Sequence, residues 1–154
     1  MVFIFLLFIE NMYIKNEKKR IMIVDDDYDI NHLFKIFLEH DGYRVHAFTD
    51  PIDALFFFRK DEYDLVLLDL KMPKMDGMML YHKLKKIDDN VLIWFITANN
   101  EYIQQLKNYI PKIENIVIYK PILLNELRKK VDSLFLLEEN ENKRRNKLTI
   151  NNIF

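Results

Sequence analysis

The sequence predicts an α/β protein with a doubly wound, five-stranded parallel sheet in the order 2-1-3-4-5 and helices on both faces. Short apolar runs alternate regularly with amphipathic segments, as expected when each strand is followed by a helix. Runs such as LVLL and LIWFI are apolar at every position, which is typical of parallel strands buried on both sides. The 154 residues are enough for one domain with a substantial core.

The first strand–helix unit consists of the strand RIMIV and a helix between Asp27 and Gly42. Apolar residues recur in this helix at spacings of three and four, which is typical of an amphipathic helix: Ile30, Leu33, Phe34, Phe37 and Leu38. Asp27 is placed to accept the free N–H groups at the helix start. Gly42 is placed to adopt the left-handed conformation that follows a helix end.

The second and third units follow the same pattern. YRVHAF is the second strand, and DPIDALFFFRK is a helix with Asp50 as its N-cap and Pro51 in its first turn, where no N–H is needed. The three phenylalanines Phe56–Phe58 are expected to be core and helix-packing residues. YDLVLLDL is the third strand, and the helix MDGMMLYHKLKKI follows it.

The last two units complete the sheet. VLIWFIT is the fourth strand, and a helix is expected from about Asn99 to Tyr109. Pro111 ends that helix, and ENIVIY is the fifth strand. The last helix is expected to open at Pro121 and to run to about Glu138.

Composition excludes several classes of protein. The formal net charge is −1, so the sequence has no basic footprint of the kind that nucleic-acid-binding proteins show. Because there is no cysteine, disulfides, thiolate metal sites and a cysteine nucleophile are excluded. The same absence is compatible with a reducing compartment, and we expect a cytoplasmic protein.

The expected organisation is a hydrophobic and charged N-terminal extension (residues 1–18), one folded domain (19–138) and a polar, frayed C-terminal tail (139–154). No repeat or Pro- or Gly/Ser-rich linker suggests a second folded domain. The N-terminal run VFIFLLFI is too short to span a membrane and lacks the flanks of a secretory signal. Three alternatives remain for it: a short membrane-surface or partner-binding anchor, an extra strand or helix on the fold, or a start codon assigned too early.

The segment IMIVDDDYDI places three carboxylates directly after a buried strand: Asp25, Asp26 and Asp27. Two like charges about 4 Å apart repel by about 4 kcal/mol at an effective dielectric constant near 20. Two interpretations account for this run. It is either a solvated turn whose last aspartate caps the next helix, or a site that binds a cation.

The predicted sheet order helps to decide between a solvated turn and a cation site. Ligands of doubly wound sheets bind beyond the carboxyl ends of the strands, where the strand order reverses. In the order 2-1-3-4-5 that place lies between the first strand, which ends at Asp25 and Asp26, and the third, which ends at Asp69. Thr97 ends the fourth strand and Lys120 the fifth, so a hydroxyl and an ammonium group are expected at the same rim. This convergence favours the cation site.

The segments IMIVDDD, LVLLDLKMPKMDG, WFITA and IYKPI, in this order, resemble the receiver domain of two-component response regulators. The resemblance covers residues 19–138 and implies that Asp69 is the phosphoacceptor. It implies that Thr97 and Lys120 contact the phosphoryl group. It also implies a Mg²⁺ ion, which hard oxygen ligands favour. The implied ligands of that ion are Asp25, Asp26, Asp69 and the backbone carbonyl of Lys71.

The function implied by the resemblance is a stand-alone, chemotaxis-regulator-like switch rather than an enzyme. It would take its phosphoryl group from a sensor histidine kinase and promote its own phosphoryl transfer and autodephosphorylation. It would signal to an unknown downstream protein, as a monomer or a phosphorylation-dependent dimer. One alternative is a degenerate receiver that acts only as an interaction module. Another is a haloacid-dehalogenase-type phosphatase, but those enzymes place a second Asp two residues after the nucleophile, where this chain has Lys71.

Overall fold

The computed structural model describes residues 18–98, 100–107 and 109–151. The described residues divide into two compact units, the first ending at Lys120 and the second beginning at Pro121. The predicted N-terminal extension, apart from Lys18, lies outside the described residues, so its three alternatives stay open.

The first unit contains one sheet of five parallel strands in the order β2-β1-β3-β4-β5. The predicted sheet and its strand order are therefore confirmed. Every residue of β3 is buried, as the continuous apolar run predicted. The strands are β1 (Arg20–Val24), β2 (Arg44–Phe48), β3 (Leu65–Asp69), β4 (Leu92–Thr97) and β5 (Val117–Tyr119).

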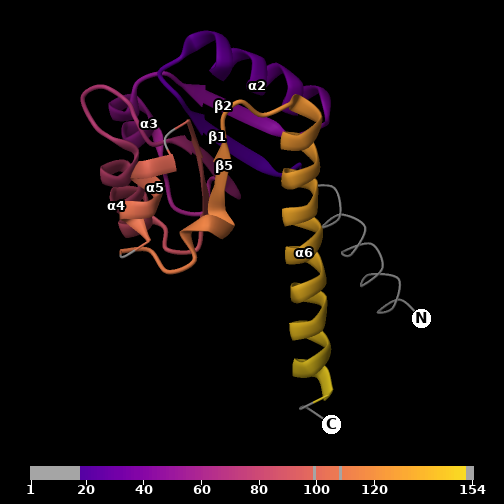
Figure 1. Ribbon diagram of the computed structural model, residues 1–154. Coiled ribbons are helices and arrows are strands. Elements are labelled where there is room, and N and C mark those ends of the chain that lie inside the picture. The colour runs from indigo at the N-terminus through magenta and orange to yellow at the C-terminus, as the bar shows by residue number, and fades with distance from the viewer. Residues whose placement is uncertain (1–17, 99, 108, 152–154) are drawn as a thin grey trace. The chain divides into compact units, whose positions relative to one another are not determined.

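Helices cover both faces of this sheet, with α2 on one side and α3, α4 and α5 on the other (Figure 1). The helices of this unit are α2 (Tyr28–His40), α3 (Pro51–Phe57), α4 (Gly77–Ile87) and α5 (Asn100–Leu106). Alternate strand residues determine the two faces, because Met22 and Val24 belong to the core cluster shared with α3, α4 and α5, whereas Ile21 and Ile23 do not.

The predicted helix boundaries are confirmed where a cap was identified. Asp27 Oδ1 accepts hydrogen bonds from the backbone N–H groups of Asp29 and Ile30, at 3.0 and 3.2 Å. Gly42 has φ +98°, the left-handed conformation expected after α2. Asp50 accepts from the N–H of Ile52 at 2.9 Å and caps α3. These ends follow from short-range hydrogen bonds that the sequence alone indicates.

The prediction that ENIVIY forms one strand is wrong in its first half. Residues Ile113–Ile116 form a 3₁₀ turn, η1, and only Val117–Tyr119 pair with β4. A 3₁₀ turn brings residues i and i+3 to the same side, whereas a strand would alternate them. Ile113 is buried in the core cluster and Ile116 packs against it, so the turn buries both. The preceding helix, α5, ends at Leu106, before the predicted Tyr109.

Of Phe56–Phe58, which the sequence predicts to be core and helix-packing residues, only Phe58 lies in the core. Phe58 is buried, but Phe56 and Phe57 are 68% and 54% exposed. Ala54 and Phe58, one helical turn apart, both belong to the core cluster, whereas Phe56 and Phe57 do not. Leu33 of α2 is likewise 50% exposed, because the buried stripe of that helix runs through Phe34 and Leu38.

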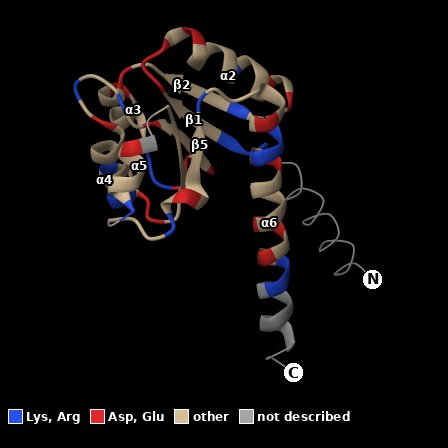
Figure 2. Cartoon of the chain, in the orientation of Figure 1, with Lys and Arg blue, Asp and Glu red and all other residues tan. Residues whose placement is uncertain are grey.

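The second unit contains α6 (Leu124–Asn151), so the prediction of a last helix ending near Glu138 is wrong. The later residues contain neither Gly nor Pro and are rich in Glu, Lys and Arg, which favour helix. Acidic residues precede basic ones along this part of α6 (Figure 2), and Glu139 and Lys143 lie one helical turn apart in the favourable orientation.

Among the described residues, no helix has the length and apolar character needed to cross a membrane.

Candidate functional site

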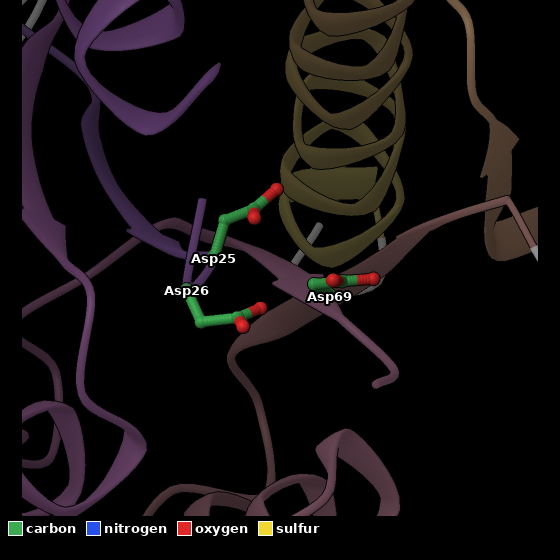
Figure 3. A group of neighbouring side chains, drawn as sticks. All are labelled: Asp25, Asp26 and Asp69. Carbon is green, nitrogen blue, oxygen red and sulfur yellow. The ribbon is translucent and has the colours of Figure 1, made fainter. Parts of the chain in front are cut away.

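Three carboxylates meet at the carboxyl ends of β1 and β3 (Figure 3). Asp25 and Asp26 follow β1 directly, and Asp69 is the last residue of β3. The two strands are paired, with Val24 opposite Leu68, so the next residues of each strand lie side by side. One carboxylate oxygen from each aspartate lies within 4.8 Å of the other two. The predicted convergence of these three side chains is therefore present in the fold.

Asp25 is 2% exposed, and its carboxylate is held from two sides. Its Oδ1 accepts a hydrogen bond from the N–H of Asp27 at 3.0 Å, and its Oδ2 accepts one from Lys120 Nζ at 2.7 Å. The Asp27 side chain itself caps α2 and is not part of the cluster. The cap interpretation of the triple-aspartate run is therefore confirmed for Asp27. The cation-site interpretation concerns Asp25 and Asp26 and stays a prediction.

The Asp69 carboxylate is also buried, and its two oxygens differ. Oδ1 accepts a hydrogen bond from the N–H of Leu70 at 2.8 Å, whereas Oδ2 lies 3.5 Å from Lys120 Nζ. Burial raises the pKa of Asp69; the Lys120 ammonium lowers it, and the neighbouring Asp25 charge raises it again. Together these effects raise the pKa of Asp69 above the ordinary value for an aspartate. The ionised form of Asp69 is therefore electrostatically unfavourable unless a further cation binds beside it.

Lys120 is the cation that joins the two buried carboxylates. Burial lowers the pKa of Lys120, but the hydrogen bond and charge of Asp25 and the charge of Asp69 outweigh it. The net pKa is raised, so Lys120 is protonated at neutral pH. Its backbone N–H donates to the carbonyl of Thr97 at 2.9 Å, which ties the ends of β4 and β5 together.

Thr97 occupies the position that the sequence predicted, at the end of β4. It is 1% exposed, and its strand neighbour Ile96 lies opposite Asp69 in the sheet register. Lys71, two residues after Asp69, is exposed, and its carbonyl as a metal ligand stays a prediction. The predicted side chains therefore come from the ends of four strands at one edge of the sheet.

Two residues near this site have structural roles that the sequence pattern does not predict. One is Gly77, the first residue of α4, whose N–H donates to the carbonyl of Leu70 at 2.9 Å. A Cβ at position 77 would lie 2.2 Å from the backbone oxygen of Asp69 and 2.8 Å from the Cα of Leu70. The glycine therefore allows α4 to approach the backbone of Asp69 closely. The other residue is Asn31, which the apolar pattern of its helix conceals.

We expect Gly77→Ala to destabilise the protein by about 2–3 kcal/mol, because the groups it would overlap are backbone and cannot turn aside. The measurement is the free energy of unfolding from urea denaturation. Gly42→Ala is the matched control. It strains a left-handed residue but has nothing within 4 Å, so a cost of about 1 kcal/mol is expected. An equal cost for both variants would contradict the close-approach explanation.

The donor set fits a hard divalent cation such as Mg²⁺. Mg²⁺ prefers oxygen ligands at about 2.0–2.1 Å, so ligands on opposite sides of the ion are about 4.2 Å apart. The carboxylate oxygens of the three aspartates lie within 4.8 Å of one another, so they need only a small movement to reach these distances. The exposed Asp26 side chain can make that movement. A cation would also relieve the repulsion between Asp25 and Asp69 that raises the pKa of Asp69.

The sequence matches a family model described as "Response regulator receiver domain" over residues 21–132. A similar curated protein is Sporulation initiation phosphotransferase F of Bacillus subtilis (strain 168), which is 35% identical over 127 residues, 81% of this chain and 98% of that protein. Other curated relatives include longer proteins, of which the chain spans about a tenth to a half.

Solved structures with the same fold include two response regulator proteins. The receiver domain protein (CheY-like) from Methanospirillum hungatei JF-1 has a TM-score of 0.71 and 28% identity, over 81% of this chain and 99% of that one. Response regulator protein TrrA from Thermotoga maritima, in complex with Mg(2+)-BeF, has a TM-score of 0.63 and 31% identity, over 75% and 98%.

Proposed function

This chain belongs to the response regulator receiver domain family of two-component systems, and we propose that it is a phosphorylation-dependent switch with Asp69 as the phosphoacceptor. The observation that carries the proposal is the meeting of Asp25, Asp26 and Asp69 within 4.8 Å, with Lys120 bound to two of them. Receiver domains are phosphoacceptor switches, and this chain retains the residue types that such a reaction needs.

Asp69 acts as the nucleophile in this proposal. Because Leu70 holds Oδ1, the oxygen that attacks is Oδ2, which faces Lys120. A bond forms between Oδ2 and phosphorus while the bond from phosphorus to the donor nitrogen breaks, and that nitrogen keeps the electron pair. The Lys120 ammonium and the Thr97 hydroxyl then stabilise the negative phosphoryl oxygens.

Mg²⁺ bound by Asp25, Asp26, Asp69 and the carbonyl of Lys71 would neutralise phosphoryl charge. Lys120 has a second role, because it holds Asp25 in place before the phosphoryl group arrives. Transfer of Lys120 from Asp25 toward the phosphoryl group would couple phosphorylation to the ends of β1 and β5.

The proposed donor is the phosphohistidine of a sensor histidine kinase, and the output is altered binding to a downstream protein. Sporulation initiation phosphotransferase F, whose name describes phosphoryl transfer, supports this class of partner. A purely interacting receiver is disfavoured by the complete acidic cluster and Lys120. A phosphatase of the haloacid dehalogenase type is disfavoured by Lys71 at the position of its second aspartate.

Acetyl phosphate tests the proposal without a kinase. With Mg²⁺, the protein is expected to gain one phosphoryl group that hydroxylamine removes, as it removes an acyl phosphate. Chelation of Mg²⁺ should reduce the label to background, as measured by intact-protein mass spectrometry. Label that survives chelation, or a hydroxylamine-stable label, would contradict the proposal. Steady phosphate release without protein label would favour the phosphatase alternative.

A further inference from the structure

Asn31 is a buried polar residue on the apolar side of α2. It is 2% exposed, in the same buried stripe as Phe34 and Leu38. Buried side-chain amides are normally retained only where hydrogen bonds compensate for the loss of water. The partners of this amide therefore indicate what the residue does.

The amide nitrogen of Asn31 joins the ends of two strands. Asn31 Nδ2 donates to the carbonyl of Asp25 at 2.9 Å and to the carbonyl of Phe48, the last residue of β2, at 2.7 Å. The Phe48 carbonyl also accepts from the N–H of Asp25 at 3.2 Å. The carbonyl of Asp25 belongs to the peptide group that links Asp25 to Asp26. One side chain thus restrains the peptide group between two of the three clustered carboxylates.

The two printed hydrogen bonds of the Asn31 amide are both made by its nitrogen, and its oxygen makes none within the described part of the chain. Oδ1 is buried without a hydrogen-bond partner among the described residues. Asn31 also lines a cavity of about 190 Å³, together with Tyr28, His32, Lys35, Ala47 and Thr49. An unpaired buried acceptor is destabilising, and a leucine of similar size would avoid that cost. The compensating benefit lies in the two hydrogen bonds to the strand ends.

We propose that Asn31 is a positioning residue for the cation site, which it preorganises by fixing the Asp25–Asp26 peptide group. The inference rests on the proposed function, because it assumes that this cluster binds Mg²⁺. Residues that hold metal ligands in place typically contribute about 10- to 100-fold to metal affinity. Asn31 acts on the backbone of the ligands, whereas Lys120 and the N–H of Asp27 act on the Asp25 carboxylate.

The test compares Mg²⁺ affinity and stability in three proteins, by isothermal titration calorimetry and urea denaturation. Asn31→Leu keeps the side-chain size but removes both donors, and its Mg²⁺ Kd is expected to rise about 10-fold or more. Leu38→Ala is the matched control, because Leu38 is fully buried two turns along the same helix. Leu38→Ala should lower the urea midpoint but leave the Mg²⁺ Kd within about twofold of the wild-type value.

A second readout uses the metal-free protein. If Asn31 fixes this peptide group, then hydrogen exchange of the Asp25 and Asp26 N–H groups should be faster in Asn31→Leu than in wild type by NMR, and unchanged in Leu38→Ala. Asn31→Ser, which keeps one hydroxyl donor, replaces Asn31→Leu if the leucine variant fails to fold. Its Mg²⁺ Kd is expected to exceed the wild-type value by less than the rise of about 10-fold expected for Asn31→Leu.

An unchanged Kd in Asn31→Leu or Asn31→Ser would overturn the inference, as would an equal rise in Leu38→Ala. Failure of the wild-type protein to bind Mg²⁺ would overturn the proposed function together with this inference. Wild-type binding with an unaltered Asn31→Leu affinity would overturn the inference alone.

Discussion

Asp69→Asn is expected to reduce phosphoryl uptake from acetyl phosphate to background, because the amide is not a nucleophile toward phosphorus. The measurement is intact-protein mass spectrometry with Mg²⁺ present. Asp64→Asn is the matched control. Asp64 is a half-buried aspartate that accepts from the N–H of Arg20 at 2.7 Å, before β3 rather than after it. Its substitution should leave the label at the wild-type level. Label on Asp69→Asn would show that another residue is the phosphoacceptor.

The same variant is expected to stabilise the protein in the absence of metal. The pKa of Asp69 in the folded state is raised above the ordinary value, chiefly by burial, so its ionisation opposes folding at pH 7. Removing the charge should therefore raise the urea midpoint of the metal-free protein. The gain should shrink as the pH falls through the folded-state pKa, and vanish below the ordinary value of 3.8, where both states are protonated. A lower midpoint for Asp69→Asn at pH 7 would contradict this electrostatic account.

Lys120→Met is expected to slow phosphorylation by about 100-fold, because it removes a cation that stabilises charge in the transition state. It should also destabilise the metal-free protein by about 3 kcal/mol, because it removes one partner of a largely buried ion pair. This value is near the lower end of the range for buried pairs, because the Lys120 side chain is 17% exposed. The ammonium competes with a metal ion for Asp25 and Asp69. Mg²⁺ affinity should therefore rise in this variant, opposite to the change expected for Asn31→Leu.

Lys74→Met is the control for Lys120→Met. Lys74 forms an ion pair with Asp50, but its side chain is 63% exposed, so solvent screens the pair and little change in stability is expected. The measurements are labelling rate, urea denaturation and Mg²⁺ calorimetry. A wild-type labelling rate or weaker Mg²⁺ binding in Lys120→Met would contradict the role assigned to this residue.

Much of the site could be predicted from the sequence because its residues lie at strand ends. The apolar runs locate the strands, and the strand order places Asp25, Asp26 and Asp69 at one edge, with Thr97 and Lys120 beside them. Helix starts at Asp27 and Asp50 depend on hydrogen bonds within three residues. Such signals are local, so they can be recognised in the sequence without knowledge of the rest of the fold.

Only the tertiary structure decided which residues support the site and which apolar residues are buried. Asn31 contacts Phe48, and Gly77 contacts the backbone of Asp69 and Leu70, so their roles depend on segments that are distant in the chain. The exposure of Phe56 depends on what packs around α3, which no local pattern specifies. Hydrophobic periodicity shows that a side chain can be buried, whereas burial itself depends on contact with the rest of the fold.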